Sequence, residues 1–435
     1  MRIAALAFIV FIGGLSGCKT ADKSGSANDL NSSSRKLVIP GTDIGDMPFE
    51  FCPQKKSFSL TNAMWLTYLA ANQYSHFKEI GPLLEKLGFG DPGEGQAYRR
   101  AWFALRIKRI QASLIDKDDE WTNESERLSR LASVKAEYAQ VFGSAYVDDG
   151  VTAAAFEEKL VSPKASNAKI QFFSGFTRSA TGEASKDSTQ AFYAEHNSKN
   201  FSVLSFRGTE VDEELDKTIN NKSDHVPLAG MGLVHTGFLS GEKQVEDGIV
   251  ALLKARSAVK PINLWITGHS LGAALATLAT ARLMLMKESG QLPNVNLMGT
   301  YHIGSPRVGD ADFASKFDAM TAKYKLNMVR FRNHHDLVTV IPFGLPFKPG
   351  YWHVGALAYF SEEGQLFYGD GWKKIEDESD YKKGLATSIE NHSAATYFSL
   401  TKRAYEENLN SPLTDCTVTA GERPLQPFRE NPASR

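Results

Sequence analysis

Hydrophobic and polar positions follow two different periods between residue 169 and about residue 400. Short apolar runs bounded by turn-forming residues are typical of buried strands. Longer stretches repeat apolar residues every three to four positions, as amphipathic helices do. Strands are predicted at 170–173, 190–194, 201–206, 262–267, 297–301 and 328–331, and helices at 242–258, 271–289 and 310–320. Strands that alternate with helices predict an α/β fold, with a mostly parallel sheet flanked by helices.

The chain before this region shows the helical period. One apolar stripe lies within 60–69 and a second within 128–141. Between them, residues 98–115 mix aromatic side chains with arginine and lysine, which we expect to form a solvated helix face. No arrangement of side chains in this helical region indicates chemistry.

The N-terminus is typical of an export signal. Arg2 precedes an apolar stretch at 3–15, which is too short to span a membrane. Leu15-Ser16-Gly17-Cys18 then resembles the bacterial lipobox, which implies cleavage before Cys18 and a lipid anchor on that cysteine. The alternative is an ordinary secretory signal with an accidental cysteine. Because Lys19 follows Cys18, we expect an exported bacterial lipoprotein in the outer rather than the inner membrane.

Together these patterns divide the chain into five parts. They are a lipoprotein signal peptide at 1–17, a Ser- and Asn-rich flexible tether at 18–38, an N-terminal helical region at 39–165, an α/β domain at 166–410 and a C-terminal tail at 411–435.

Charge and composition exclude some partners. The 435 residues include 49 Lys and Arg and 50 Asp and Glu, which leaves a net charge of −1. Without a basic excess, nucleic acid is not an expected partner. Outside the N-terminus, no apolar run is long enough to cross a bilayer.

The strongest chemical signal is the turn Gly268-His269-Ser270-Leu271-Gly272, between a predicted strand and a predicted helix. A strand that turns directly into a helix strains the residue at the apex, and its neighbours must lack side chains so that the two elements can close together. The serine hydroxyl then stands at a helix N-terminus, which favours developing negative charge. This pattern predicts a nucleophile elbow with Ser270 as the nucleophile.

A serine needs a histidine to take its proton and a carboxylate to orient that histidine. In α/β-hydrolases, both follow the serine along the chain, the acid first. Asp336 follows a predicted strand directly, whereas the competing Asp310 and Asp312 open a helix, where carboxylates are commonly caps. For the histidine, we favour His392 at the start of the last helix over His353, which lies in a predicted hairpin.

The order of several motifs resembles the class 3 (fungal-type) lipases of the α/β-hydrolase superfamily, from about residue 169 to 400. The matching motifs are Phe206-Arg207-Gly208-Thr209, Val234-His235-Thr236-Gly237-Phe238, Thr267-Gly268-His269-Ser270-Leu271-Gly272-Ala273-Ala274, Gly304-Ser305-Pro306-Arg307-Val308-Gly309, Asn333-His334-His335-Asp336, and His392 shortly before an aromatic pair.

This resemblance implies a lipase-like catalytic domain at 166–410, with Ser270 as nucleophile, Asp336 as acid and His392 as base. It also implies an oxyanion hole from the backbone N–H groups of Thr209 and Leu271, and no metal or other cofactor.

Cysteine usage adds one structural expectation. Apart from Cys18, the chain contains only Cys52 and Cys416, which in an exported protein are either a disulfide or two unrelated thiols. Fungal members of the family tie an early helix to the C-terminal tail in a comparable way, and this resemblance implies that the two cysteines pair.

The predicted activity is hydrolysis of carboxylic esters of lipids or other acyl compounds through an acyl-enzyme. Residues 210–230 occupy the place of the lipase lid but hold few large apolar side chains, which leaves room for soluble esters or phospholipids as substrates. The alternatives are a phospholipase A1 or acyltransferase with the same machinery, and a catalytically silent surface lipoprotein. An intact Ser270, Asp336 and His392 argue against the silent scaffold.

Overall fold

A computed structural model describes nine segments of the chain: 42–74, 77–113, 124–148, 168–174, 190–208, 224–342, 350–369, 389–408 and 416–428. Contacts divide the chain into two compact units, Met1–Lys36 and Leu37–Arg435, and every described residue belongs to the second. The signal peptide, Cys18 and the tether therefore lie outside the described residues.

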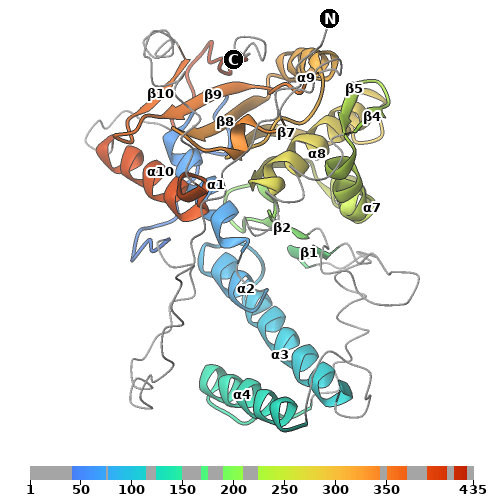
Figure 1. Cartoon of the computed structure of the whole chain (residues 1–435), viewed down its shortest axis with the longest axis vertical. Helices are drawn as coiled ribbons and strands as arrows, with labels where there is room; N and C mark the ends of the chain where they lie inside the picture. The colour runs from blue at the N-terminus through green and yellow to red at the C-terminus, as the bar shows by residue number, and fades with distance from the viewer. Residues whose placement is uncertain are drawn as a thin grey trace, which may run out of the picture. The chain divides into compact units, whose positions relative to one another are not determined.

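A single sheet organises the described part of the chain (Figure 1). Its eight described strands lie in the order β1-β2-β3-β6-β7-β8-β9-β10, and their bounds are Ile170–Ser174, Gln190–Glu195, Ser202–Phe206, Ile262–His269, Val295–Ile303, Asn327–Asn333, Ala356–Phe360 and Leu366–Tyr368. The five strands from β3 to β9 pair in parallel, and the antiparallel pairs lie at the two edges. This is the mostly parallel sheet, with antiparallel edges, that the alternation of strands and helices predicts.

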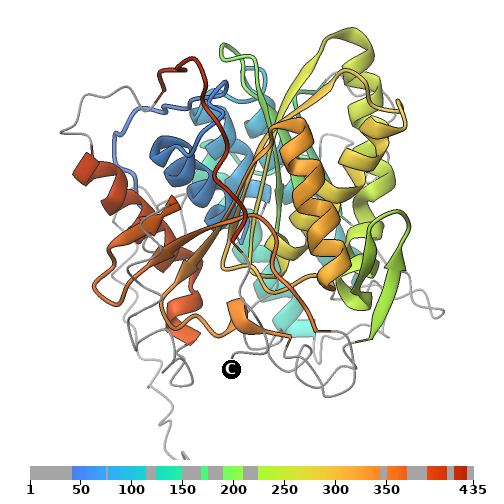
Figure 2. The ribbon, with the colours of Figure 1, turned by 90° about the horizontal axis from the view of Figure 1, so that it is seen from above.

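Helices cover both faces of the sheet because its central strands are apolar on both sides. Figure 2 shows α1 (Leu60–Asn72) and α10 (Ala394–Asn408) on one side, with α7 (Thr236–Val259), α8 (Leu271–Glu288) and α9 (Ala311–Tyr324) on the other. Within β6, Trp265 packs into the core under α1 and α10, whereas Leu264 and Ile266 pack into the core under α7 to α9. The alternation follows from the two-residue period of a strand.

The N-terminal helical region contributes directly to this core. Helix α1 was expected to bury one stripe, but every residue from Thr61 to Asn72 is buried, because the helix lies between the sheet and α10. Helix α3 (Glu94–Ser113) packs on α2 (Phe77–Lys86), and α4 (Glu124–Phe142) packs on α3. In the second predicted stripe, Tyr138 is buried against α3, but Leu128 is 51% exposed.

Two helices differ in length from their predictions. Helix α7 begins at Thr236 instead of 242, because the His235 side chain caps it by accepting the Phe238 N–H. Helix α9 continues to Tyr324 and ends at Lys325, whose φ of 53° is left-handed. No helix in the described segments combines the length and apolar character needed to cross a bilayer.

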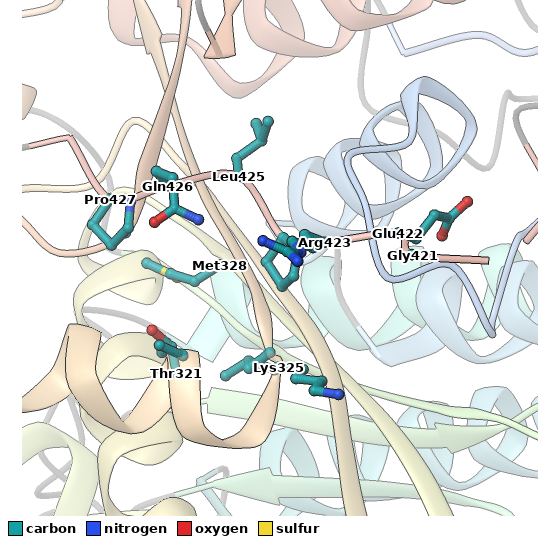
Figure 3. A pocket seen from close by; sticks show the side chains of 13 residues that line it. Thr321, Lys325, Met328, Gly421, Glu422, Arg423, Leu425, Gln426 and Pro427 are labelled. Atoms are coloured by element: carbon teal, nitrogen blue, oxygen red, sulfur yellow. The ribbon is translucent and has the colours of Figure 1, made fainter. Parts of the chain in front are cut away.

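The C-terminal tail lies along the edge of the sheet where β8 begins. Cys416 is disulfide-bonded to Cys52, the pairing implied by the family resemblance, and Lys55 forms an ion pair with Glu422. The tail at 421–427, the end of α9 and the start of β8 enclose a cavity of about 480 Å³ (Figure 3). Since it borders the N-terminal end of β8, this cavity lies away from the carboxyl ends of the strands, where α/β folds place their active sites.

Candidate active site

The turn after β6 has the strained geometry of a nucleophile elbow. Ser270 lies between the end of β6 and the start of α8 with φ 62° and ψ −130°, a conformation that costs a non-glycine residue about 1–3 kcal/mol. The flanking glycines allow this turn. A Cβ on Gly268 would clash with the backbone of Gly272, and a Cβ on Gly272 would clash with the backbone of Phe206 and Arg207.

Three side chains from different elements meet at this turn. His392, at the end of the short 3₁₀ helix η4 (Ile389–His392), places Nε2 2.6 Å from Ser270 Oγ. On the other side of the ring, His392 Nδ1 lies 3.0 and 2.9 Å from the two carboxylate oxygens of Asp336. All three side chains are fully buried. This is the spacing at which a histidine can take a proton from a serine while a carboxylate fixes its orientation.

The carboxylate of Asp336 is itself held from two further directions. Its Oδ1 accepts the Val338 N–H at 2.9 Å, and its Oδ2 accepts the Tyr397 hydroxyl at 2.6 Å. The Tyr397 oxygen in turn accepts the Asn333 N–H at 2.8 Å. Burial, reinforced by the Asp336 charge, raises the pKa of Tyr397 well above 10, so the phenol remains a donor. No sequence motif predicts this contact, because Tyr397 and Asp336 are 61 positions apart.

Comparison with known proteins agrees with this geometry. Residues 203–345, about a third of the chain, match the class 3 lipase family. Ser270 and Asp336 fall within that match, and His392 follows it. This region of the chain is therefore similar to the class 3 lipases.

Curated relatives of this region include plant and fungal enzymes. Phospholipase A(1) DAD1 of Arabidopsis thaliana is 30% identical over 157 residues, which are 32% of this chain and 33% of that protein. A lipase of Rhizopus niveus is 31% identical over 154 residues, 35% of this chain and 36% of that protein. The secreted mono- and diacylglycerol lipase A of Penicillium cyclopium is 32% identical over 167 residues, which are 38% of this chain and 50% of that protein. The chain therefore spans a third to a half of the length of these relatives.

The competing acids, Asp310 and Asp312, have other partners. Asp310 is the N-cap of α9, where its side chain accepts the Phe313 N–H. Asp312 pairs with Lys316 one turn later on the exposed face of that helix. The Nδ1 of His392 faces Asp336, 2.9 Å from Oδ2.

The competing histidine, His353, supports the loop that follows the acid. Its Nε2 donates to the Thr339 carbonyl at 2.7 Å, and the Thr339 hydroxyl donates to the Asp336 carbonyl at 2.7 Å. The hairpin predicted around His353 is absent from this described stretch, where only a single bridge joins Trp352 to Gly309. The segment around His353 is therefore held by single contacts to Gly309 and to the Thr339 carbonyl.

One of the two predicted oxyanion donors is described. Leu271 is the first residue of α8, so no carbonyl within the helix can accept its N–H, and the helix dipole favours negative charge beside it. Thr209 lies outside the described residues, as does most of the predicted lid. The end of that lid segment forms β4 (His225–Leu228), which pairs with β5 (Gly232–His235).

Acid–base and nucleophilic chemistry is what this arrangement supports. Over the described residues, no group of three or more His, Cys, Asp and Glu side chains is placed to hold a metal ion. The site provides a serine hydroxyl, an imidazole that contacts it and a helix N-terminus beside them.

Proposed function

We propose that the protein is a serine carboxylic-ester hydrolase that acts on lipids or other acyl esters through Ser270, His392 and Asp336. The observation that carries this proposal is the continuous chain of contacts from Ser270 Oγ to His392 Nε2 at 2.6 Å and from His392 Nδ1 to Asp336 at 2.9 Å. The match of residues 203–345 to the class 3 lipase family supports it.

Acylation follows from this geometry. His392 Nε2 takes the proton of Ser270 Oγ while that oxygen attacks the ester carbonyl, and Asp336 stabilises the resulting imidazolium. The carbonyl oxygen becomes an oxyanion beside the Leu271 N–H and, in our proposal, the Thr209 N–H. Each such donor typically stabilises the transition state by about 3 kcal/mol. As the C–O bond breaks, His392 returns its proton to the leaving alcohol, and an acyl-Ser270 ester remains.

Deacylation repeats these steps with water. His392 takes a proton from the water that attacks the acyl-Ser270 carbonyl, and the same donors hold the second oxyanion. When the intermediate collapses, the proton passes to Ser270 Oγ and the carboxylic acid leaves. In an acyltransferase, an alcohol acceptor would replace this water without any change in the protein groups.

Phospholipase A1 activity is a second candidate. The relative DAD1 is a phospholipase A(1), and the lid segment at 210–230 carries several acidic residues with few large apolar ones, unlike a surface that adsorbs to fat. Glycerophospholipids and short-chain esters therefore rank above triglycerides as proposed substrates.

A substrate panel tests this proposal. The purified enzyme would be assayed on p-nitrophenyl esters of increasing acyl length, on phosphatidylcholine and on triolein, each beside Ser270→Ala. We expect Ser270-dependent release of p-nitrophenol and of fatty acid from phosphatidylcholine, with less from triolein. Hydrolysis that is equal in both proteins, or absent from the whole panel, would overturn the ester-hydrolase proposal.

Membrane anchoring is a separate proposal. We infer from the lipobox-like Leu15-Ser16-Gly17-Cys18 that Cys18 carries acyl chains and holds the catalytic domain at the outer membrane. In the source cell, Cys18→Ser should leave the membrane fraction and stop incorporating labelled palmitate. A variant that remains in the membrane fraction and still carries the label contradicts the anchor.

A further inference from the structure

A residue from the N-terminal helical region reaches the catalytic turn. Tyr74, in the turn after α1, places its hydroxyl 2.7 Å from Nδ1 of His269, the residue before Ser270. A Cβ on Gly208, next to the predicted oxyanion residue Thr209, would collide with this hydroxyl and would lie 3.1 Å from Ser270 Cβ. Tyr74 thus stands beside the nucleophile, although no chemistry was expected from its region.

The other nitrogen of His269 contacts the proposed base. His269 Nε2 lies 2.7 Å from the main-chain oxygen of His392, and the centres of the two imidazole rings are 4.6 Å apart. His269 is 2% exposed. His269, which precedes Ser270, therefore contacts the main chain of His392, the proposed base.

These contacts allow only one assignment of protons to a neutral ring. A carbonyl oxygen only accepts, so His269 Nε2 must carry the hydrogen and donate it to His392. Burial, followed by the adjacent His392, lowers the pKa of His269 well below 6.5, so Nδ1 carries no second proton. The Tyr74 hydroxyl must then be the donor to Nδ1.

We propose that Tyr74 and His269 are positioning residues for the Ser270–His392 pair. The Tyr74 hydroxyl holds His269 in its Nε2–H tautomer, and this tautomer fixes the His392 main chain relative to Ser270. The proposal rests on the proposed hydrolase function and adds residues that act through the base without touching the substrate.

Two physical effects follow from the arrangement. The first is geometric. The His392 side chain contacts Ser270 at 2.6 Å, and its main-chain oxygen is held by His269, the residue before Ser270. The second is electrostatic, because His392 becomes an imidazolium during acylation and a charged ring 4.6 Å away would oppose it. The titratable and charged groups recorded around His269 and its donor are His392 itself, Tyr397, Tyr74 and Arg207, which lies over the Tyr74 ring.

Tyr74→Phe removes only the hydroxyl and gives the sharpest test. We expect kcat for a p-nitrophenyl ester to fall about tenfold with KM unchanged, as loss of one orienting hydrogen bond would produce. The matched control is Tyr98→Phe, which removes a buried hydroxyl of α3 that donates to the Ile170 carbonyl at 2.6 Å, away from the triad. Tyr98→Phe should lower the melting temperature without lowering kcat.

A double-mutant cycle and a spectroscopic measurement complete the experiment. If the two residues act as one unit, Tyr74→Phe should have no further effect on kcat in a His269→Leu background. In nitrogen NMR spectra of the wild type, His269 should show a protonated Nε2 and an unprotonated Nδ1, and Tyr74→Phe should populate the other tautomer.

Full kcat in Tyr74→Phe, additive effects in the double mutant, or an unchanged tautomer would overturn the positioning role. These outcomes differ from failure of the hydrolase proposal, in which Ser270→Ala itself would retain activity.

Discussion

At the scale of single residues, the chemistry depends on which histidine reaches Ser270. His392 contacts both Ser270 and Asp336, whereas His353 donates to a carbonyl in the loop after the acid. The two side chains are similarly buried, with exposures of 0% and 5%, so burial alone does not distinguish them. Only the contacts separate a base from a structural histidine.

Replacing each histidine by alanine should therefore give different results. His392→Ala should reduce kcat by roughly 10⁴, as loss of a triad member does, with the fold intact. His353→Ala should lower the melting temperature, because the Thr339 carbonyl loses its buried donor, and should leave most of kcat. Kinetics and thermal unfolding of both variants check this. An inactive His353→Ala beside an active His392→Ala would reverse the assignment.

Much of the candidate site could be predicted from sequence because motif spacing reports local geometry. Ser270 stands out through its flanking glycines, and Asp336 through its place at the end of a strand. Tyr74 and Tyr397 could not be found in this way. Their hydroxyls reach partners 195 and 61 positions away, and nothing in a 3.6-residue period marks an aromatic residue as a donor.

At the scale of elements, helix α7 carries two buried acids, Glu242 and Glu246. Glu246 pairs with Arg282 of α8, whereas Oε2 of the neighbouring Glu242 has no recorded hydrogen bond among the described groups. Burial, together with the nearby Glu246 charge, raises the pKa of Glu242 from 4.5 to about 8. The fold is therefore more stable when Glu242 is protonated.

This shift predicts a pH dependence of stability. An acid whose pKa is higher in the folded protein destabilises the fold as it ionises, so the free energy of unfolding should fall from about pH 4.5 towards pH 8. Glu242→Gln should remove most of this decline and be more stable than the wild type at pH 8.5, with little difference at pH 4.5.

Denaturant unfolding across this pH range measures the effect, and Glu124→Gln serves as the control because Glu124 is exposed on a different helix, α4. A Glu242→Gln variant with the same pH slope as the wild type would show that Glu242 is not the source.

Most helices and strands were predictable, and the differences between prediction and structure have local causes. Helix α7 starts six residues early because a histidine side chain supplies its cap, which the apolar period does not report. Helix α1 is buried on all sides by tertiary packing, although its sequence suggests one apolar face.

At the scale of the whole molecule, the two ends of the folded unit are joined beside the sheet. The Cys52–Cys416 disulfide closes a separation of 364 residues, and Cys52 is also hydrogen-bonded to Asn62 at the start of α1. The opposite end of α1 leads to Tyr74 at the active site. With 13 residues, this helix is about 20 Å long, and the disulfide and Tyr74 lie beyond its opposite ends.

Removal of the disulfide should consequently affect stability more than catalysis. We expect the double variant Cys52→Ser, Cys416→Ser to lose about 4 kcal/mol in the free energy of unfolding, with kcat within about twofold of wild type. Denaturant unfolding and ester hydrolysis on the same preparations measure both. Unchanged stability would mean that the tail contributes little to the fold, and a large loss of kcat would connect the disulfide to the site.

The central claim is that Ser270 is the nucleophile of an acyl-enzyme mechanism. The most direct measurement is covalent labelling of the native protein with a fluorophosphonate probe, followed by mass spectrometry of the labelled peptide. We predict one label, on Ser270, which is absent from Ser270→Ala although that variant melts at nearly the wild-type temperature. Labelling of Ser270 should also be strongly slowed in His392→Ala, because no base then takes the serine proton. Labelling that survives Ser270→Ala, or that falls on another residue, would contradict the account.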